Sequence, residues 1–190
     1  MRLFVASEIG ETLAAKTAEV SRVLQRRTAA STPLAKVTWV PPDRLHLTIR
    51  FIGEVDDRQA ASVGVALEPP LTIAPFDLTL AGVGAFPKRG SPRVLWIGVA
   101  RGGDALIAAE HEVTARLASL GIPREERAYS PHLTLARVRE AAGLRTEQLL
   151  DGLTDAVIGT EHIDAITLFR SKLSPKGPAY TPLVRIRCKT

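Results

Sequence analysis

The chain has 190 residues, of which 45% are hydrophobic, so it can bury a core large enough to fold without disulfides. Its formal net charge of +5 favours polyanionic partners, and its single cysteine, Cys188, excludes an intramolecular disulfide. Residues 1–10 lack the apolar run of a signal peptide, and no stretch is long enough to span a bilayer, so we expect a cytoplasmic protein with no membrane attachment.

Hydrophobic periodicity predicts a mixture of strands and helices in the first half of the chain. The segments expected as strands are 2–6, 37–40, 45–51 and 76–83, and those expected as helices are 11–27 and 56–67. Asp56 and Asp57 mark the start of the second helix, because acidic side chains favour a helix N-terminus.

The second half repeats this order after a Gly/Pro-rich loop at 86–92. The expected strands are 93–99, 132–138, 163–169 and 183–187, with helices at 104–120 and 147–157 and a turn at 174–178. Corresponding strands of the two halves start 93 − 2 = 91 and 163 − 76 = 87 residues apart. We therefore expect one bilobal domain over residues 1–190, with repeats of about 1–86 and 92–190.

This duplication predicts an α+β fold with pseudo-twofold symmetry. Each repeat is expected to form one lobe, a small and mainly antiparallel sheet with helices on its outer side. The active-site cleft is expected between the two lobes.

Two of the four histidines lie in nearly identical tetrapeptides, His46-Leu47-Thr48-Ile49 and His132-Leu133-Thr134-Leu135. Side chains alternate along a strand, so the histidine and the threonine of each motif share one face while the apolar residues face a core. Imidazole titrates near neutral pH. The repetition therefore indicates a pair of histidines that perform acid–base chemistry.

With these motifs the chain resembles the 2H phosphoesterases, a family named for two His-x-Thr/Ser-x motifs. More narrowly it resembles the bacterial and archaeal RNA 2′,3′-cyclic phosphodiesterases, historically called 2′-5′ RNA ligases. The resemblance extends over most of the chain and is carried by RLFVA at 2–6, WVPPDRLHLTIRFIGEV at 39–55, PRVLWIGV at 92–99, SPHLTLARVR at 130–139 and YTPL at 180–183.

The resemblance implies hydrolysis of RNA 2′,3′-cyclic phosphate ends, or of cyclic nucleotides, to 2′-phosphate ends, with 2′-5′ ligation as the reverse reaction. It makes His46 the proton donor to the leaving 3′ oxygen and His132 the proton acceptor that activates water. Thr48 and Thr134 then donate hydrogen bonds to the phosphate oxygens. This chemistry needs no metal and no other cofactor, and no obligate protein partner is expected.

Three further residues are expected to bind substrate. Arg137 matches an arginine that the family places after the second motif, although strict alternation puts it on the face of Leu133 and Leu135 unless a bulge turns it. Alternation puts Arg50 on the face of His46. Tyr129, just before the second motif, has a ring that could stack on a base.

Three other functions remain open from the sequence. A metal hydrolase would need three or more clustered ligands, whereas each motif offers one histidine. A covalent hydrolase would need an acidic residue to orient its base, and neither motif contains one. The third alternative is a non-catalytic module that binds RNA ends through a basic cleft.

Overall fold

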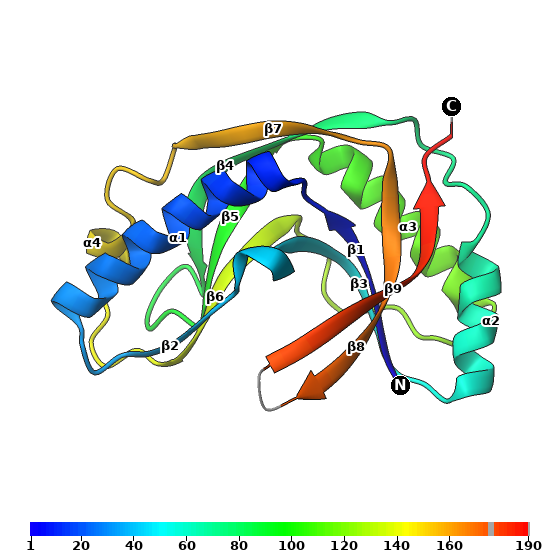
Figure 1. Ribbon diagram of the computed structural model, residues 1–190, viewed down its shortest axis with the longest axis horizontal. Helices are drawn as coiled ribbons and strands as arrows, with labels where there is room; N and C mark the ends of the chain where they lie inside the picture. The colour runs from blue at the N-terminus through cyan, green and yellow to red at the C-terminus, as the bar shows by residue number, and fades with distance from the viewer. Residues whose placement is uncertain (175–176, 190) are drawn as a thin grey trace.

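Two antiparallel sheets curve around a common concave side and give the molecule the shape of an arch (Figure 1). The computed structural model describes residues 1–174 and 177–189. Within that part of the chain the first sheet has the strand order β3-β1-β8-β9, and the second has the order β2-β6-β5-β4-β7.

The strands of the first sheet are β1 (Arg2–Glu8), β3 (His46–Glu54), β8 (Ala165–Ser174) and β9 (Gly177–Arg187). Those of the second sheet are β2 (Lys36–Trp39), β4 (Phe76–Phe86), β5 (Val94–Arg101), β6 (His132–Glu140) and β7 (Val157–Ile163). The two motif strands, β3 and β6, come from different sheets and contact each other.

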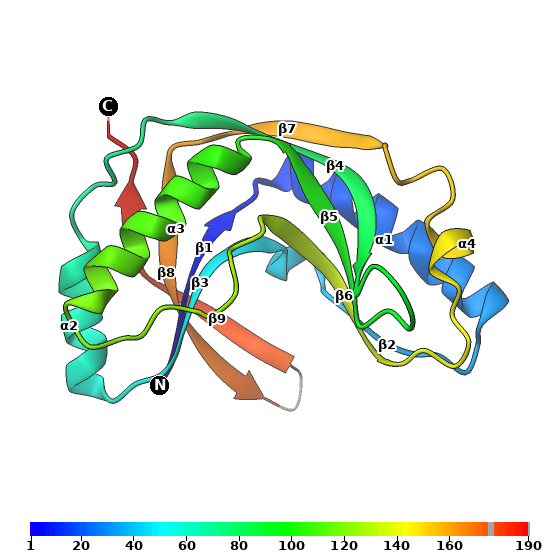
Figure 2. The same cartoon turned by 180° about the vertical axis from the view of Figure 1, so that it is seen from behind.

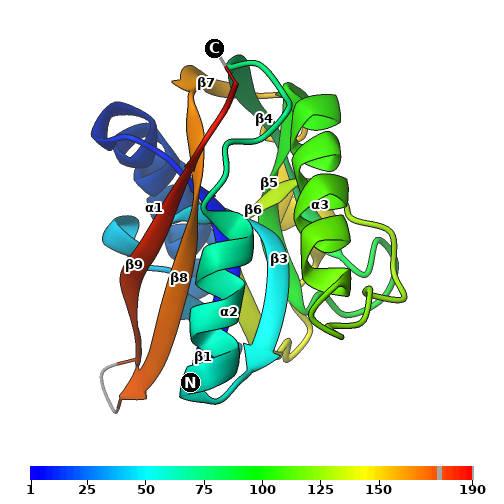
Figure 3. The same ribbon diagram turned by 90° about the vertical axis from the view of Figure 1, so that its right-hand side faces the viewer.

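The helices are α1 (Glu11–Ser31), α2 (Asp57–Leu67), α3 (Gly103–Ala118) and the short α4 (Thr146–Leu150), and a 3-10 turn, η1 (Pro42–Arg44), precedes β3. As predicted from its acidic start, α2 is capped by Asp56, whose carboxylate accepts a hydrogen bond of 2.7 Å from the backbone N–H of Gln59. Figure 3 shows α2 and α3 side by side next to the first sheet, where α3 contacts β3 and α2 contacts β9.

Each sheet combines strands from both sequence repeats. The strands β8 and β9 of the second repeat complete the first sheet, while β2 and β4 of the first repeat lie in the second sheet. The helices cross over in the same way, because α1 packs on β7 and α3 packs on β3 (Figure 2). The α+β class and the two antiparallel sheets with outer helices are confirmed, but the prediction that each repeat forms its own lobe is wrong.

The apolar residues between the motif side chains form the predicted core. Leu47, Leu133 and Leu135 are fully buried, and Ile49 is 3% exposed. Burial of a leucine of this size contributes about 2 kcal/mol relative to an exposed one. The core therefore anchors the strand face opposite the histidines.

Two predicted elements near the C-terminus differ from the structure. A helix is predicted over 147–157, but α4 ends at Leu150 and Val157 begins β7. The last strand is predicted from residue 183 and instead begins at Gly177, within the predicted turn. Pro175 and Lys176 of that turn lie outside the described residues.

Candidate active site

A cavity of about 220 Å³ lies where the two motif strands meet. Its wall is formed by side chains of β1, β3, β8 and β9 from the first sheet, of β6 from the second, and of η1 and the residues next to it. His46 and Thr48 reach it from β3, and Thr134 and Arg137 reach it from β6. The cavity therefore joins residues from both motifs, which are far apart in the sequence.

The ring of His46 is held in one orientation by aromatic neighbours and by a backbone carbonyl. Its centroid lies 5.2 Å from that of Phe4 and 5.3 Å from that of Tyr180. Its Nδ1 lies 2.7 Å from the carbonyl oxygen of Arg44. A carbonyl only accepts hydrogen bonds, so the proton of the neutral ring is on Nδ1, and Nε2 is left available for chemistry.

Burial lowers the pKa of His46 below its ordinary value. The carbonyl of Arg44 and the carboxylate of Glu8 oppose this shift, whereas the guanidinium of Arg137 adds to it. The neutral form of the ring is therefore favoured in the protein without substrate.

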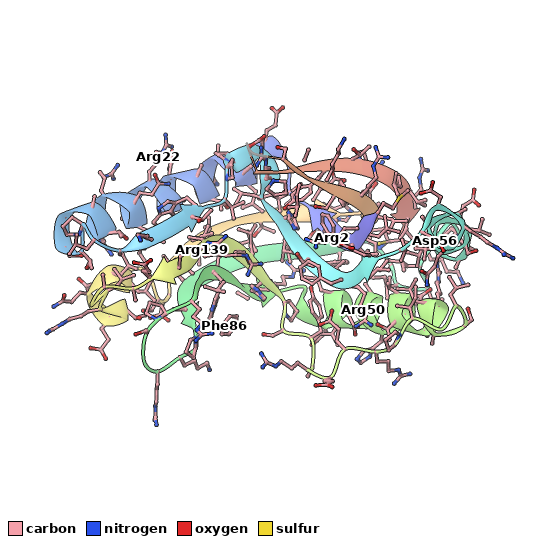
Figure 4. All side chains as sticks on the ribbon, turned by 90° about the horizontal axis from the view of Figure 1, so that it is seen from below. Arg2, Arg22, Arg50, Asp56, Phe86 and Arg139 are labelled. Carbon is pink, nitrogen blue, oxygen red and sulfur yellow. The ribbon has the colours of Figure 1, made fainter. Side chains whose placement is uncertain are left out.

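His132 has matching surroundings in the second sheet. Its Nδ1 lies 2.7 Å from the carbonyl oxygen of Ser130, so this ring too has its proton on Nδ1 and leaves Nε2 available. The ring of Phe86 meets it edge-on at 5.3 Å, and Figure 4 shows Phe86 at the end of β4. His132 itself is outside the cavity wall, next to Thr134 on the same face of the strand.

A β-bulge in β6 explains how Arg137 reaches the cavity. Thr134 pairs with Trp96 and Ala136 pairs with Leu95, so Leu135 is an extra residue in the strand. Leu135 and Ala136 are consequently both buried, and Arg137 is exposed on the face of Thr134. Of the two explanations that the sequence leaves open for Arg137, the bulge is the one found.

The same irregularity in β3 turns Arg50 away from the cavity. Thr48 pairs with Ala6 and Arg50 pairs with Val5, so Ile49 is the extra residue. Arg50 is 3% exposed, and its guanidinium faces α3 and the segment that follows it (Figure 4). The prediction that Arg50 shares a face with His46 is wrong, because strict alternation does not continue through a bulge.

Tyr129 is also absent from the cavity wall. Its ring packs against the hydrophobic core and lines a second cavity beside α3. Burial raises the pKa of its hydroxyl, and a nearby carboxylate, that of Glu110, adds to the shift. This tyrosine is not placed to stack on a base bound at the histidines.

Sequence reasoning overlooks three aromatic residues of the cavity wall, Phe4, Phe51 and Tyr180. Phe51 follows its motif histidine by five residues, as Arg137 does, and the bulge turns both toward the cavity. Comparing the two motifs at this spacing would have identified Phe51. Tyr180 lies 134 residues after His46 (180 − 46), and only the strand order of the first sheet brings it close.

Replacing Tyr180 by alanine is expected to raise the pKa of His46, because water then reaches a ring that burial now desolvates. Since folding lowers this pKa, acidification below about pH 6.5 favours the unfolded chain, and the variant should lose less stability there. Titration of the histidine ring protons by NMR measures the effect. His111, whose side chain is 75% exposed, serves as the internal control, and an unchanged His46 pKa would contradict the expectation.

Among residues 1–174 and 177–189, no group of three or more His, Cys, Asp or Glu side chains is arranged to hold a metal ion. None of the helices in that part of the chain is both long and apolar enough to span a membrane.

Known proteins match the chain over nearly all of its length. The RNA 2′,3′-cyclic phosphodiesterase of Aeropyrum pernix is 34% identical over 169 residues, which cover 88% of this chain and 96% of the relative. The protein of the same name from Archaeoglobus fulgidus is 33% identical over 183 residues, or 96% of this chain and 98% of the relative.

Solved structures agree with these relatives. A crystal structure of a protein from Thermus thermophilus superposes with a TM-score of 0.76 at 29% identity, covering 98% of this chain and 97% of that one. E. coli LigT in complex with 3′-AMP superposes with a TM-score of 0.71 at 26% identity, covering 100% and 98%.

The family model described as LigT like Phosphoesterase matches twice, over residues 12–96 and 97–180. Each match contains one His-x-Thr strand, β3 in the first and β6 in the second. Because the two matches together span most of the sequence, this chain belongs to the LigT-like 2H phosphoesterase family.

Proposed function

We propose that this protein hydrolyses RNA 2′,3′-cyclic phosphate ends to 2′-phosphate ends by acid–base catalysis with two histidines. The observation that carries the proposal is that two strands with the same His-x-Thr pattern meet at one cavity, and that each ring has its Nδ1 proton committed to a carbonyl. The relatives named RNA 2′,3′-cyclic phosphodiesterase support the choice of substrate.

In this mechanism each ring uses Nε2. His132 accepts a proton from water as the water oxygen bonds to phosphorus, the bond from phosphorus to O3′ breaks, and His46 donates its proton to O3′. Thr48 and Thr134 donate hydrogen bonds to the non-bridging phosphate oxygens as charge develops on them. A 5′-hydroxyl in place of water would give a 2′-5′ bond.

The lowered pKa of His46 makes its donor role depend on the substrate. A neutral ring has no proton to give from Nε2, because its one proton is on Nδ1. A phosphate bound next to Nε2 carries negative charge, which stabilises the imidazolium. Binding of the substrate phosphate therefore favours the protonated form of His46 that the donor role requires.

The remaining wall of the cavity suits a nucleotide end. Arg137 offers a guanidinium fork for phosphate oxygens. Phe51, which is 55% exposed, and Tyr180 present aromatic rings on which a base can stack. The net positive charge of the chain favours approach of an RNA strand.

The test is to incubate the protein with an RNA that ends in a 2′,3′-cyclic phosphate, with EDTA present, and to identify the terminal phosphate. The expected product is a 2′-phosphate. A 3′-phosphate would overturn the assigned regiochemistry, and activity abolished by EDTA and restored by a metal would overturn the two-histidine mechanism. Tight binding of the RNA without product would favour the RNA-end-binding module instead.

A further inference from the structure

The two motif strands differ in what lies on their outer side. In the second sheet β2 pairs with β6, through Trp39 opposite Ala136 and Thr38 opposite Arg137. The backbone N–H of Val40 extends this contact by a hydrogen bond of 2.8 Å to the carbonyl of Leu135. The chain runs from β2 through η1 to His46. Pairing of β2 with β6, the strand that carries His132, therefore also holds the segment that precedes His46.

The counterpart of β2 in the other half can be located by the spacing of the histidines. That spacing is 132 − 46 = 86 residues, which places the counterpart at 36 + 86 = 122 to 39 + 86 = 125. Residues 122–125 form no strand, and in the described part of the chain β3 is an edge strand with no partner on that side. Strand pairing with β3 therefore does not hold the segment that precedes His132 in place.

Arg50 makes the missing connection with its side chain. It occupies the position equivalent to Ala136, since 50 + 86 = 136. One guanidinium nitrogen donates a hydrogen bond to the carbonyl oxygen of Pro123, and the other lies 3.6 Å from a carboxylate oxygen of Glu125 and 4.0 Å from one of Glu110. The Arg50 side chain is 3% exposed and that of Glu110 12%, so their ion pair is largely shielded from water and from salt, whereas the Glu125 side chain is 49% exposed.

The segment that Arg50 holds leads to the second histidine. Seven residues after Pro123 (130 − 123) comes Ser130, whose carbonyl accepts the Nδ1 proton of His132. Between the two, the ring of Tyr129 packs into the core and limits how the segment can move. Arg50 at Pro123 and the Tyr129 ring in the core thus restrain the segment at two points before the carbonyl that orients the ring.

We propose that Arg50 is a positioning residue that connects the first motif strand to the segment before His132 and thereby fixes the orientation of the His132 ring. It does for this half of the molecule what the ladder between β2 and β6 does for the other. A planar fork suits the task because it contacts a carbonyl and a carboxylate in fixed directions, which an ammonium group does not. The expected effect of Arg50 on catalysis rests on the proposed function, whereas its expected effect on the orientation of the His132 ring does not.

The inference is tested with Arg50→Met and Arg50→Lys. NMR of protein labelled with ¹⁵N in histidine, at alkaline pH where the rings are neutral, is expected to show both motif rings protonated on Nδ1 in the unchanged protein. In both variants His132 should change to a mixture of tautomers while His46 keeps its Nδ1 proton. With the cyclic phosphate substrate, kcat should fall about 10-fold to 100-fold with KM little changed, as misplaced catalytic groups cause.

Two further variants control for unfolding and for charge. Arg124→Met removes an exposed arginine of the same segment and should leave both tautomers and kcat unchanged. Arg50→Met combined with Glu110→Gln removes the carboxylate that the single variant would leave nearly buried, at 12% exposure, so it should fold if the single variant does not.

A folded Arg50→Met protein, or the folded double variant, whose His132 keeps the Nδ1 proton would overturn the inference. So would Arg50→Lys with an unchanged His132 tautomer and full kcat, because charge alone would then suffice. Because the NMR experiment needs no turnover, failure of the proposed function would be seen separately, as an unchanged protein that does not cleave the cyclic phosphate.

Discussion

Asparagine in place of His46 or His132 is expected to lower kcat for the cyclic phosphate by about 10²–10⁴-fold, the usual contribution of a general acid or base. The amide of asparagine can still donate a hydrogen bond to the carbonyl of Arg44 or Ser130, as Nδ1 does now. It has no group that titrates near neutral pH. The substitution therefore removes the proton transfer and disturbs the surrounding structure little.

The measurement is single-turnover cleavage of an RNA with a 2′,3′-cyclic end, with fluorescence anisotropy for its affinity. Affinity should stay within a few-fold of that of the unchanged protein, since the proposed phosphate contacts of Arg137 and the threonines would be kept. His111→Asn is the matched control, because His111 is an exposed residue of α3 that does not line the cavity. If either motif variant kept full turnover, the two-histidine mechanism would be wrong.

Valine in place of Thr48 or Thr134 is expected to lower kcat by about 10²-fold, which is the lower end of what one hydrogen-bond donor contributes to a developing oxyanion. Both side chains line the cavity and are half-buried, and valine has the same shape without the hydroxyl. Because the hydrogen bonds strengthen as charge builds on the phosphate, kcat should change more than KM.

Steady-state kinetics of Thr48→Val, Thr134→Val and the corresponding serine variants measure this effect. Serine keeps the hydroxyl and should retain most of the rate, which separates the loss of a donor from the loss of a methyl contact. Valine variants as fast as the serine variants would show that the hydroxyls do not stabilise the transition state.

The motif strands show how far a sequence pattern predicts this site. Alternation along each strand places the histidine with the threonine two residues on, and it places the buried leucines correctly. Alternation fails after Ile49 and Leu135, because each of these is the extra residue of a β-bulge. Nothing local distinguishes these apolar residues from ordinary strand residues, so the inward turn of Arg50 could not be predicted.

The C-terminal strands were harder to predict for another reason. Pro178 and Pro182 argue against a strand, since proline cannot donate to a ladder, yet both lie in β9. β9 is at the edge of the first sheet, where a missing N–H is tolerated. β7 is likewise an edge strand, and its partner β4 lies about eighty residues earlier. Such non-local pairing is decided by the fold and has no signal within the strand.

Each sheet contains strands of both repeats, so the molecule cannot be divided between the repeats without breaking both sheets. A break in the loop near Gly90 would separate β1 and β3 from β8 and β9, and β4 from β5 and β6, so both fragments would carry unfinished sheets. We therefore expect that neither half folds alone. Strands of the two repeats complete each other's sheets, and the contact between the two motif strands depends on the chain as a whole.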